Sequence, residues 1–350
     1  MRRLTLRCSR TLSCARDQWR PAVAAATDVR AEGPLFHDGI HLFQPTAGNL
    51  APQPGSPLCD GGAQADFAPA VDVVFIHGLR GGPFGTWRTA PTAAAEDKQR
   101  DAVLVWPSDW LAADVGPRVR LLSLAFRSRY SDWGSATSPR LEALAEELLQ
   151  TLVAAGVGQR PLVVVTHSMG GVLLKLLLAR SMEAAAADAA PPCARGALAA
   201  QLRGAVFYSC PHFGSRLAEL GAWRLARLAA PVAELRSSNV DQLAALNEPL
   251  RAAHRRKRHP LRVVCFLEGR PTPLLQLPVP PGLAARAPAI RYEVVAPESA
   301  YPGFGDLVVL PQADHVTACK PGAKGDPSYA LVLQLVRDVL AEAQQVPGTT

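Results

Sequence analysis

The sequence has no run of eighteen or more apolar residues, so it predicts no membrane-spanning helix. The alanine-rich stretch around Glu183–Ala200 is too short for that role, and prolines interrupt it. The sequence shows no internal repeat, no cluster of metal-ligating residues and no glycine-rich loop of the kind that cradles phosphates. We therefore expect no metal, nucleotide or redox cofactor.

Cysteine is scarce and scattered. The seven cysteines are odd in number and include no C-x-x-C pair, which argues against a disulfide framework and against a zinc site. This usage is typical of a protein in a reducing compartment. The cysteines are Cys8, Cys14, Cys59, Cys193, Cys210, Cys265 and Cys319.

Acidic residues are absent from the start of the chain. No acid precedes Asp17, whereas six arginines lie between Arg2 and Arg20, with Ser and Thr among them. This composition resembles a mitochondrial transit peptide, and a disordered basic tail is the alternative interpretation. There is no apolar core of a secretory signal. We assign residues 1–34 as a basic N-terminal tail and residues 35–345 as one domain.

The 350 residues are 48% hydrophobic, which is enough to bury a sizeable core. The formal net charge is +7, and part of it lies in the run His254–His259. That run is either the solvated end of a helix or a contact for anionic lipid headgroups at a membrane surface. Nucleic acid is excluded as a partner because no aromatic platform or groove-reading element accompanies the basic residues.

Predicted strands and helices alternate along the chain, which is typical of an α/β fold with a mostly parallel sheet flanked by helices. We predict a helix from Ser138 to Ala155, a loose connection between Met182 and Arg195, and a closing helix from Pro327 to about Ala343. Ser108 or Asp109 is expected to cap a short helix within 106–111. The predicted strands are 71–76, 119–126, 161–166, 204–209, 261–267 and, as the last one, 290–295, with a short strand or hairpin within 35–43.

A second helical region is rich in Leu and Ala from Leu217 to Ala253. In this kind of fold, an insertion at that place forms a cap over the site, and we assign residues 211–260 to such a helical cap. The alternative is a set of extra helices packed on the core for stability.

The stretch Pro161–Lys175 predicts a buried strand, a very tight turn and a helix, with Ser168 at the apex. Such a turn strains the apex residue and pushes its hydroxyl out above the sheet edge. Gly170 and Gly171 supply the small residues needed where strand and helix nearly touch. Thr166 stands where the G-x-S-x-G pattern has its first glycine, so the match to this pattern is imperfect. The alternative to a catalytic serine turn is an ordinary glycine-rich turn between a strand and a helix.

Two backbone N–H groups are expected to face a developing oxyanion. Met169 follows the serine at a helix N-terminus, where N–H groups point outward. The glycine-rich loop after the strand 71–76 supplies the second donor in this type of fold, and Leu79 is our choice. We interpret His77 as a residue that fixes this loop and not as a base.

A serine hydroxyl needs a base, and a histidine needs an acid behind it to fix its tautomer. Of eight histidines, only His315 follows the last predicted strand. Glu268 ends the penultimate strand, where catalytic groups gather on such sheets, and it is the preferred acid. The rivals are Glu298, Asp306 and Asp314, the last ranked low because it adjoins His315.

These motifs together resemble the serine-active-site-containing protein 1 family. The resemblance runs from about Leu35 to Leu340. It implies an α/β-hydrolase of the lipase class, with the family's serine at Ser168, its histidine at His315 and its carboxylate at Glu268. The segments that carry it are 75–79, 86–88, 106–107, 166–171, 211–212, 214–219, 297–300, 314–315 and 319–321.

The resemblance also implies remodelling of phosphatidylglycerol at contacts between mitochondria and endoplasmic reticulum, with effects on cardiolipin and cholesterol handling. The expected activity is therefore a serine ester hydrolase or acyltransferase on a glycerophospholipid. The location is expected to be the mitochondrion or its contact with the endoplasmic reticulum, and otherwise the cytoplasm. The alternatives are a non-catalytic lipid-binding or scaffolding protein and a glycosylphosphatidylinositol-type ester hydrolase.

Overall fold

The structure is a computed structural model that describes residues 39–43, 69–89, 104–126, 141–187, 193–215, 235, 239–273 and 291–345. Contacts divide the chain into the units 1–33 and 34–350, and only the second contains described residues. The basic tail predicted over residues 1–34 and the cysteines Cys8, Cys14 and Cys59 lie outside them.

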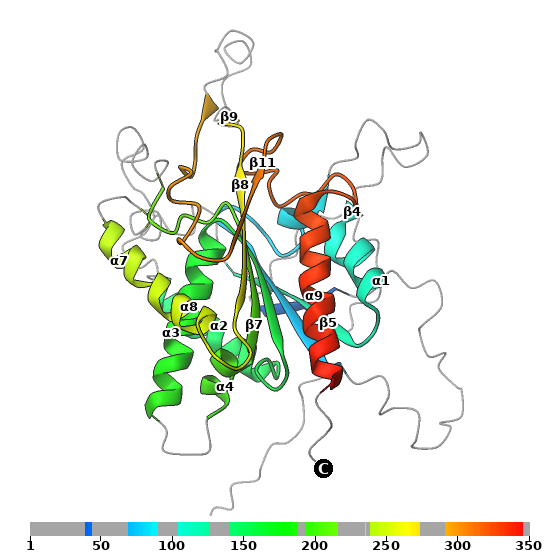
Figure 1. Cartoon of the computed structure of the whole chain (residues 1–350), viewed down its shortest axis with the longest axis vertical. Coiled ribbons are helices and arrows are strands. Elements are labelled where there is room, and N and C mark those ends of the chain that lie inside the picture. Colours follow the sequence, from blue (N-terminus) through cyan, green and yellow to red (C-terminus); the bar gives the residue numbers. More distant parts are fainter. Residues whose placement is uncertain are drawn as a thin grey trace, which may run out of the picture. The chain divides into compact units, whose positions relative to one another are not determined.

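The described part of the second unit is built on a seven-stranded sheet in the order β1-β5-β2-β6-β7-β8-β11 (Figure 1). The edge strand β1 runs antiparallel to β5, and all the other neighbouring strands are parallel. The strands are β1 (Gly39–Leu42), β2 (Val71–Ile76), β5 (Val119–Ala125), β6 (Leu162–His167), β7 (Leu202–Tyr208), β8 (Arg262–Glu268) and β11 (Asp306–Leu310).

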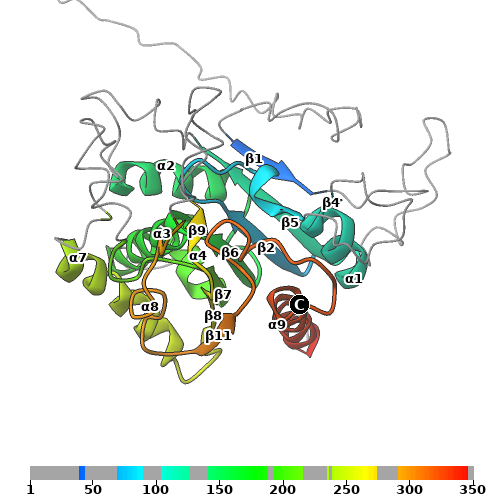
Figure 2. The ribbon, with the colours of Figure 1, turned by 90° about the horizontal axis from the view of Figure 1, so that it is seen from above.

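Helices cover both faces of the sheet, as Figure 2 shows from above. One face carries α1 and α9, and the other carries α2, α3, α4 and α8. The helices are α1 (Ala112–Val115), α2 (Leu141–Ala154), α3 (Met169–Ala187), α4 (Ala194–Gln201), α7 (Val240–Ala245), α8 (Asn247–His254) and α9 (Pro327–Gln345), with a 3-10 turn at Gly85–Trp87. This arrangement confirms the predicted α/β fold with a mostly parallel sheet.

The central strands are apolar on both sides because both faces are covered. In β2, Val74 and Ile76 face the core layer under α2 and α3, whereas Val73 and Phe75 face the layer under α9. Every residue of β2 and of β6 is buried. Successive side chains of a strand point to opposite faces, so a continuous apolar run marks a strand buried on both.

The predicted last strand was wrong. Within the described residues 291–295, β10 (Arg291–Tyr292) is the one strand, and it pairs with β9 (Thr272–Pro273) outside the main sheet. The last strand of the sheet is β11, a five-residue edge strand that leaves three of its residues exposed although Leu307–Leu310 are all apolar. His315 still follows the last strand, because β11 ends at Leu310.

Two local predictions were also wrong. The stretch between Met182 and Arg195 was expected to be a loose connection, but α3 continues to Ala187 and α4 begins at Ala194. Neither Ser108 nor Asp109 caps a helix, because both lie inside a π-helical turn, Pro107–Leu111. The Asp109 carboxylate instead accepts the N–H of Val105 (2.7 Å) in the two-residue strand β4 (Leu104–Val105), which pairs with β3 (Arg88–Thr89).

The region 211–260, assigned to a cap, is described only in part. Its helix α8 contacts α3, and Leu250 and Ala253 are buried in the core layer on that face of the sheet. Residues 216–234 lie outside the described part, so the cap stays a prediction. No helix among the described residues is long and apolar enough to cross a membrane.

A buried carboxylate ties the amino ends of three strands together. Asp72 of β2 is fully buried, and Arg120 of β5 contacts it through two nitrogens at 2.7 and 2.9 Å. Arg160, just before β6, adds a third contact at 3.1 Å. Arg120 also donates to the Ala155 carbonyl at the end of α2 (2.9 Å).

We expect Asp72→Ala to lower the free energy of unfolding by about 3 kcal/mol, because two arginines would lose their buried partner. Chemical denaturation measures this loss. Glu183→Ala is the matched control, since its ion pair with Arg180 is largely exposed and should matter by less than about 1 kcal/mol. Equal losses in the two variants would contradict the assigned role of Asp72.

Candidate functional site

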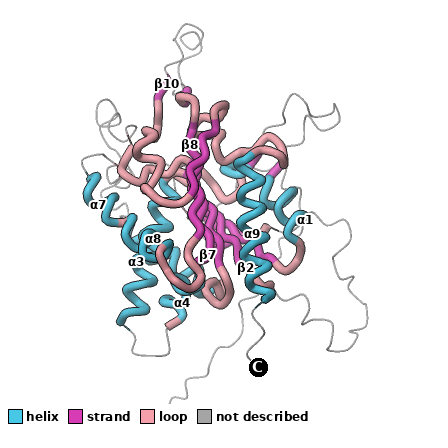
Figure 3. Tube along the Cα trace, viewed as in Figure 1, coloured by secondary structure: helices cyan, strands magenta, loops and turns pink. Residues whose placement is uncertain are grey.

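The loops at the carboxyl ends of the parallel strands gather at one end of the sheet (Figure 3). Ser168 lies there, between β6 and α3, with φ of 53°, in the left-handed region that non-glycine residues rarely adopt. Its N–H donates to the Tyr208 carbonyl at the end of β7 (2.9 Å), and its carbonyl accepts the N–H of Gly171 (3.0 Å). The structure therefore has the strained strand-to-helix turn that the sequence predicts.

Three glycines let other chain segments approach this turn. A Cβ on Gly170 would lie 2.3 Å from the Ile76 carbonyl oxygen, and one on Gly171 would lie 2.4 Å from the Cys210 sulfur. A Cβ on Gly78 would lie 2.8 Å from the Cβ of Ser168. Each distance is shorter than any real Cβ contact, so these positions require glycine.

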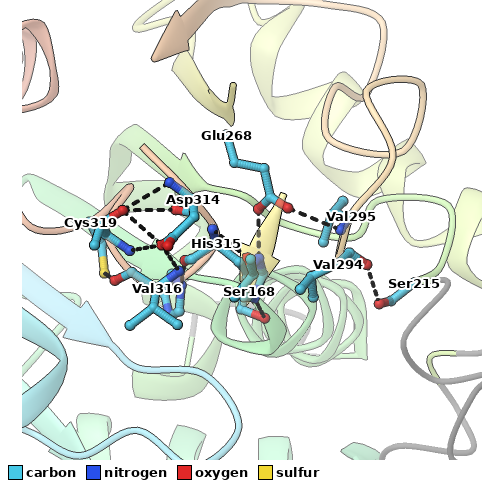
Figure 4. Close-up of polar contacts among 12 residues, drawn as sticks. Ser168, Ser215, Glu268, Val294, Val295, Asp314, His315, Val316 and Cys319 are labelled. Carbon is cyan, nitrogen blue, oxygen red and sulfur yellow. Dashed lines mark hydrogen bonds and ion pairs between the residues drawn. The ribbon is translucent and has the colours of Figure 1, made fainter. Parts of the chain in front are cut away.

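Three side chains meet in one line of hydrogen bonds (Figure 4). The Ser168 hydroxyl lies 2.9 Å from Nε2 of His315, and Nδ1 of His315 lies 2.7 Å from Oε2 of Glu268. A carboxylate only accepts hydrogen bonds, so Nδ1 carries the proton and Nε2 is free to accept one from the serine. Glu268 and His315 are both buried, whereas Ser168 is half-buried.

The three rival acids lie elsewhere. The Asp314 carboxylate accepts the backbone N–H groups of Val316 (3.0 Å) and Thr317 (2.9 Å) and so shapes its own turn. Asp306 is exposed at the start of β11. Glu268, on the neighbouring strand β8, lies opposite Leu310 at the other end of β11. Glu298 is exposed on the loop after β10.

The backbone of His315 is held on both sides. Its N–H donates to the Thr272 hydroxyl (3.0 Å), and its carbonyl accepts a hydrogen bond from Nε2 of His167 (2.8 Å). His167 is the last residue of β6 and directly precedes Ser168. The strand that leads into the serine turn therefore also fixes the loop that carries His315. Sequence reasoning missed both contacts, although His167 lies within the predicted motif.

Glu268 is held by a loop that is itself anchored. Its second oxygen accepts the N–H of Val295 (3.4 Å), and the neighbouring Val294 carbonyl accepts the Ser215 hydroxyl (2.6 Å; Figure 4). The Ser299 hydroxyl donates to the Gly214 carbonyl (2.6 Å). The segments 212–215 and 294–299 therefore form one unit beside the carboxylate.

A glycine after Glu268 brings the histidine loop close. The N–H of Gly269 donates to the carbonyls of Leu310 and Ala313, both at 3.0 Å. A Cβ on this glycine would lie 2.6 Å from the Cα of Pro311. This close approach places the 311–315 loop over the end of β8, where Glu268 meets His315.

The two N–H groups predicted to face an oxyanion come from the helix after the serine and from the loop after β2. Met169 is the first residue of α3 and is buried, and Leu79 is half-buried in the loop after β2. Neither N–H has a hydrogen-bond acceptor among the described residues. Their role toward an oxyanion stays a prediction.

A buried polar network lies behind the serine turn. Lys175 of α3 is fully buried and donates to the Asn247 side-chain oxygen (3.0 Å), which also accepts Nδ1–H of His212 (3.2 Å). Burial lowers the pKa of Lys175. The network joins α3 to α8 and to the loop after β7, so it helps to fix the helix that starts at the serine.

No group of three or more His, Cys, Asp and Glu side chains in the described ranges is arranged to hold a metal ion. The four cysteines within those ranges are free thiols, and burial raises the pKa of Cys210 and of Cys319 to about 12.

A family model, the alpha/beta hydrolase family, matches residues 73–321, which include β2, the serine turn, Glu268 and His315. The chain belongs to the alpha/beta hydrolase family. The matched span covers all the site residues described above.

Curated relatives of this alpha/beta hydrolase agree with the resemblance predicted from its motifs. Protein SERAC1 of Bos taurus is 31% identical over 317 residues, which are 88% of this chain and 42% of that protein. Protein SERAC1 of Danio rerio is 35% identical over 283 residues, 77% of this chain and 39% of that protein. The chain thus spans about two fifths of the length of these relatives.

Among solved structures, phospholipase PlaB from Legionella pneumophila in complex with thio-NAD aligns with a TM-score of 0.50 at 14% identity. The alignment covers 78% of this chain and 60% of PlaB. At this identity the likeness concerns the fold alone, and it agrees with the alpha/beta hydrolase sheet described above.

Two buried histidines of this hydrolase fold should make its stability depend on pH. Burial lowers the pKa of His77 from 6.5 to about 4, and burial together with the charge of His315 lowers that of His167 to about 3. The unfolded state therefore binds more protons between pH 6.5 and 4. The free energy of unfolding should fall on acidification through this range, by about 1.4 kcal/mol per pH unit for each histidine.

The test compares denaturation at several pH values for the parent and for His77→Asn. Asparagine can keep the donor to the Gly78 carbonyl that Nδ1 of His77 provides (2.9 Å), but it does not titrate. We expect the pH slope to shrink by about 1 kcal/mol per unit. An unaltered slope in His77→Asn would show that the buried histidine is not responsible.

We also expect Asn247→Ala to destabilise the fold by about 2 kcal/mol, because the buried amine of Lys175 would lose its acceptor. The double variant Lys175→Met, Asn247→Leu removes both polar groups and should recover much of that loss. Thermal or chemical denaturation compares the two. A double variant less stable than Asn247→Ala would contradict the inferred coupling.

Proposed function

We propose that this chain is a serine ester hydrolase or acyltransferase that acts on acyl esters of glycerophospholipids. The observation that carries the proposal is the unbroken line from the strained Ser168 through His315 to Glu268, with separations of 2.9 and 2.7 Å. Membership of the alpha/beta hydrolase family supports the same reaction class.

In the proposed reaction, Ser168 Oγ attacks the acyl carbonyl carbon while its proton passes to Nε2 of His315. Glu268 stabilises the imidazolium through Nδ1–H and keeps the ring in the tautomer that accepts the proton. The N–H groups of Leu79 and Met169 receive the oxyanion. The C–O bond to the leaving alcohol then breaks, and His315 returns the proton to that oxygen.

The acyl-enzyme is resolved by a second hydroxyl compound. Water gives a free acid and completes a hydrolysis, whereas a lysolipid hydroxyl gives a new ester and completes an acyl transfer. In both cases His315 removes the proton of the incoming hydroxyl and returns it to Ser168 Oγ.

The proposed substrate class rests on the family resemblance of the motifs, because the site residues themselves specify only an acyl ester. Phosphatidylglycerol is the proposed lipid, with the mitochondrion or its contact with the endoplasmic reticulum as the proposed location. A protein named a phospholipase has the same fold, which supports an acyl-ester substrate.

Covalent labelling with a fluorophosphonate tests the serine. The parent should label, Ser168→Ala should not, and His315→Ala should label on the order of 10³ times more slowly because the base is missing. Glu268→Gln should also slow labelling strongly, whereas Glu298→Gln, which changes an exposed carboxylate nearby, should label like the parent. A folded parent that stays unlabelled would overturn the proposed function.

The lipid is tested by mass spectrometry of the products from vesicles of phosphatidylglycerol, phosphatidylcholine or phosphatidylethanolamine. Release or transfer of acyl chains from phosphatidylglycerol above the other two supports the proposed headgroup, and Ser168→Ala sets the background. Equal turnover of all three would reject the headgroup and keep the reaction class.

A further inference from the structure

A pocket of about 540 Å³ lies far from Ser168. Its wall includes Arg203, which stands at the start of β7, whereas the serine N–H meets Tyr208 at the end of that strand. Five residues of strand separate the two points by roughly 17 Å. Figure 1 shows α4, which forms part of the wall, at the end of the sheet opposite to the labels of β8, β9 and β11.

One side of the pocket is apolar. Met182, Ala185 and Ala186 come from the last turns of α3, and Ala199 and Ala200 come from the last turn of α4. The volume is in the usual range for a small-molecule site, and small side chains on one wall leave room for an alkyl chain.

The other side of the pocket is basic. Arg203, Arg256, Arg258 and His259 line it, and no acidic residue does. The arginines come from two separate segments, the start of β7 and the turn between α8 and β8. The wall is therefore assembled by the fold and is more than a run of charges in the sequence.

Two of these arginines have a structural role that leaves some of their donors unused. Arg203 donates to the Ala200 carbonyl (2.6 Å) and Arg256 to the Ala199 carbonyl (2.9 Å), at the C-terminal end of α4. Arg203 also donates to the Leu202 carbonyl (3.5 Å) and to the Gln201 side-chain oxygen (3.3 Å). Burial and the nearby charge of Arg256 lower the pKa of Arg203, so the two cations disfavour each other. Each guanidinium has five N–H donors, and an anion between them would relieve this repulsion.

The other two basic residues of the wall, Arg258 and His259, do not hold the end of α4. Arg258 makes no hydrogen bond or ion pair with any described residue. The nearby carboxylate of Glu342 is paired with Arg262 instead. His259 has φ of 52°, a strained backbone that turns the chain at the rim of the pocket.

We propose that this pocket binds a single-chain anionic amphiphile, with its head on Arg203, Arg256 and Arg258 and its alkyl chain along the wall of Met182, Ala185 and Ala186. Charge complementarity selects a phosphate or carboxylate head, and the apolar wall selects a chain. The site is independent of the proposed reaction, because none of its residues lies beside Ser168.

Isothermal titration calorimetry with dodecyl phosphate tests the site, using the Ser168→Ala chain so that no turnover occurs. We expect Arg258→Gln to weaken the affinity at least tenfold, because one charge-assisted hydrogen bond is lost. Lys257→Gln makes the same charge change one residue away, at an exposed position outside the pocket, and should change the affinity less than twofold.

The apolar wall is tested separately. Ala186→Glu places a negative charge in the pocket and should weaken binding at least tenfold, whereas Ala187→Glu, outside the pocket wall, should have little effect. Both positions are exposed, so the variants should fold, and circular dichroism checks that they do. Equal effects within either pair, or binding unchanged in Arg258→Gln and Ala186→Glu, would overturn the proposal.

Three further probes identify the recognised chemistry. Inorganic phosphate should bind far more weakly than dodecyl phosphate, because it lacks the chain, and laurate shows whether a carboxylate head is accepted as well. Vesicles containing 30% phosphatidylglycerol test the membrane alternative. If sedimentation with them falls equally in Lys257→Gln and Arg258→Gln while dodecyl phosphate fails to bind, the charges form a diffuse membrane contact and the pocket proposal is rejected.

Discussion

The site depends on one close approach, where the turn from β6 to α3 holds Ser168 at a positive φ against two neighbouring segments. The strain is local, and the glycines at 78, 170 and 171 remove the side chains that would keep these segments apart. The hydrogen bond from the serine N–H to Tyr208 then fixes the turn to the next strand. Backbone geometry thus sets the direction of the hydroxyl, and His315 and Glu268 are placed around it.

The fold could be predicted where the apolar signal was strong. Strands buried on both faces, such as β2 and β6, were found within one or two residues because every side chain in them is apolar or buried. β11 was missed because its apolar run is only four residues long, and α4 was missed because Pro191 and Pro192, just before it, favoured a loop. Whether so short a segment joins the edge of the sheet depends on tertiary contacts, which do not appear in a local pattern.

The candidate site was predictable as residue types and only partly as an arrangement. The motif gave Ser168, and the order of strands and motifs gave His315 and Glu268, which the structure brings together. The supporting contacts from His167 and Thr272 to the backbone of His315 could not be predicted, since each joins positions tens of residues apart or more without a motif. Such contacts depend on how loops close, which short-range spacing does not encode.

The strand order has a consequence for biosynthesis. The serine turn is completed by β6, β7 and the loop after β2, whereas His315 lies on the loop after β11, which pairs with β8 near the end of the chain. Because contacts between distant segments form late in folding, a growing chain holds Ser168 without His315 until these last segments dock. The fold therefore brings the two side chains within hydrogen-bond distance only when nearly the whole sheet has been made.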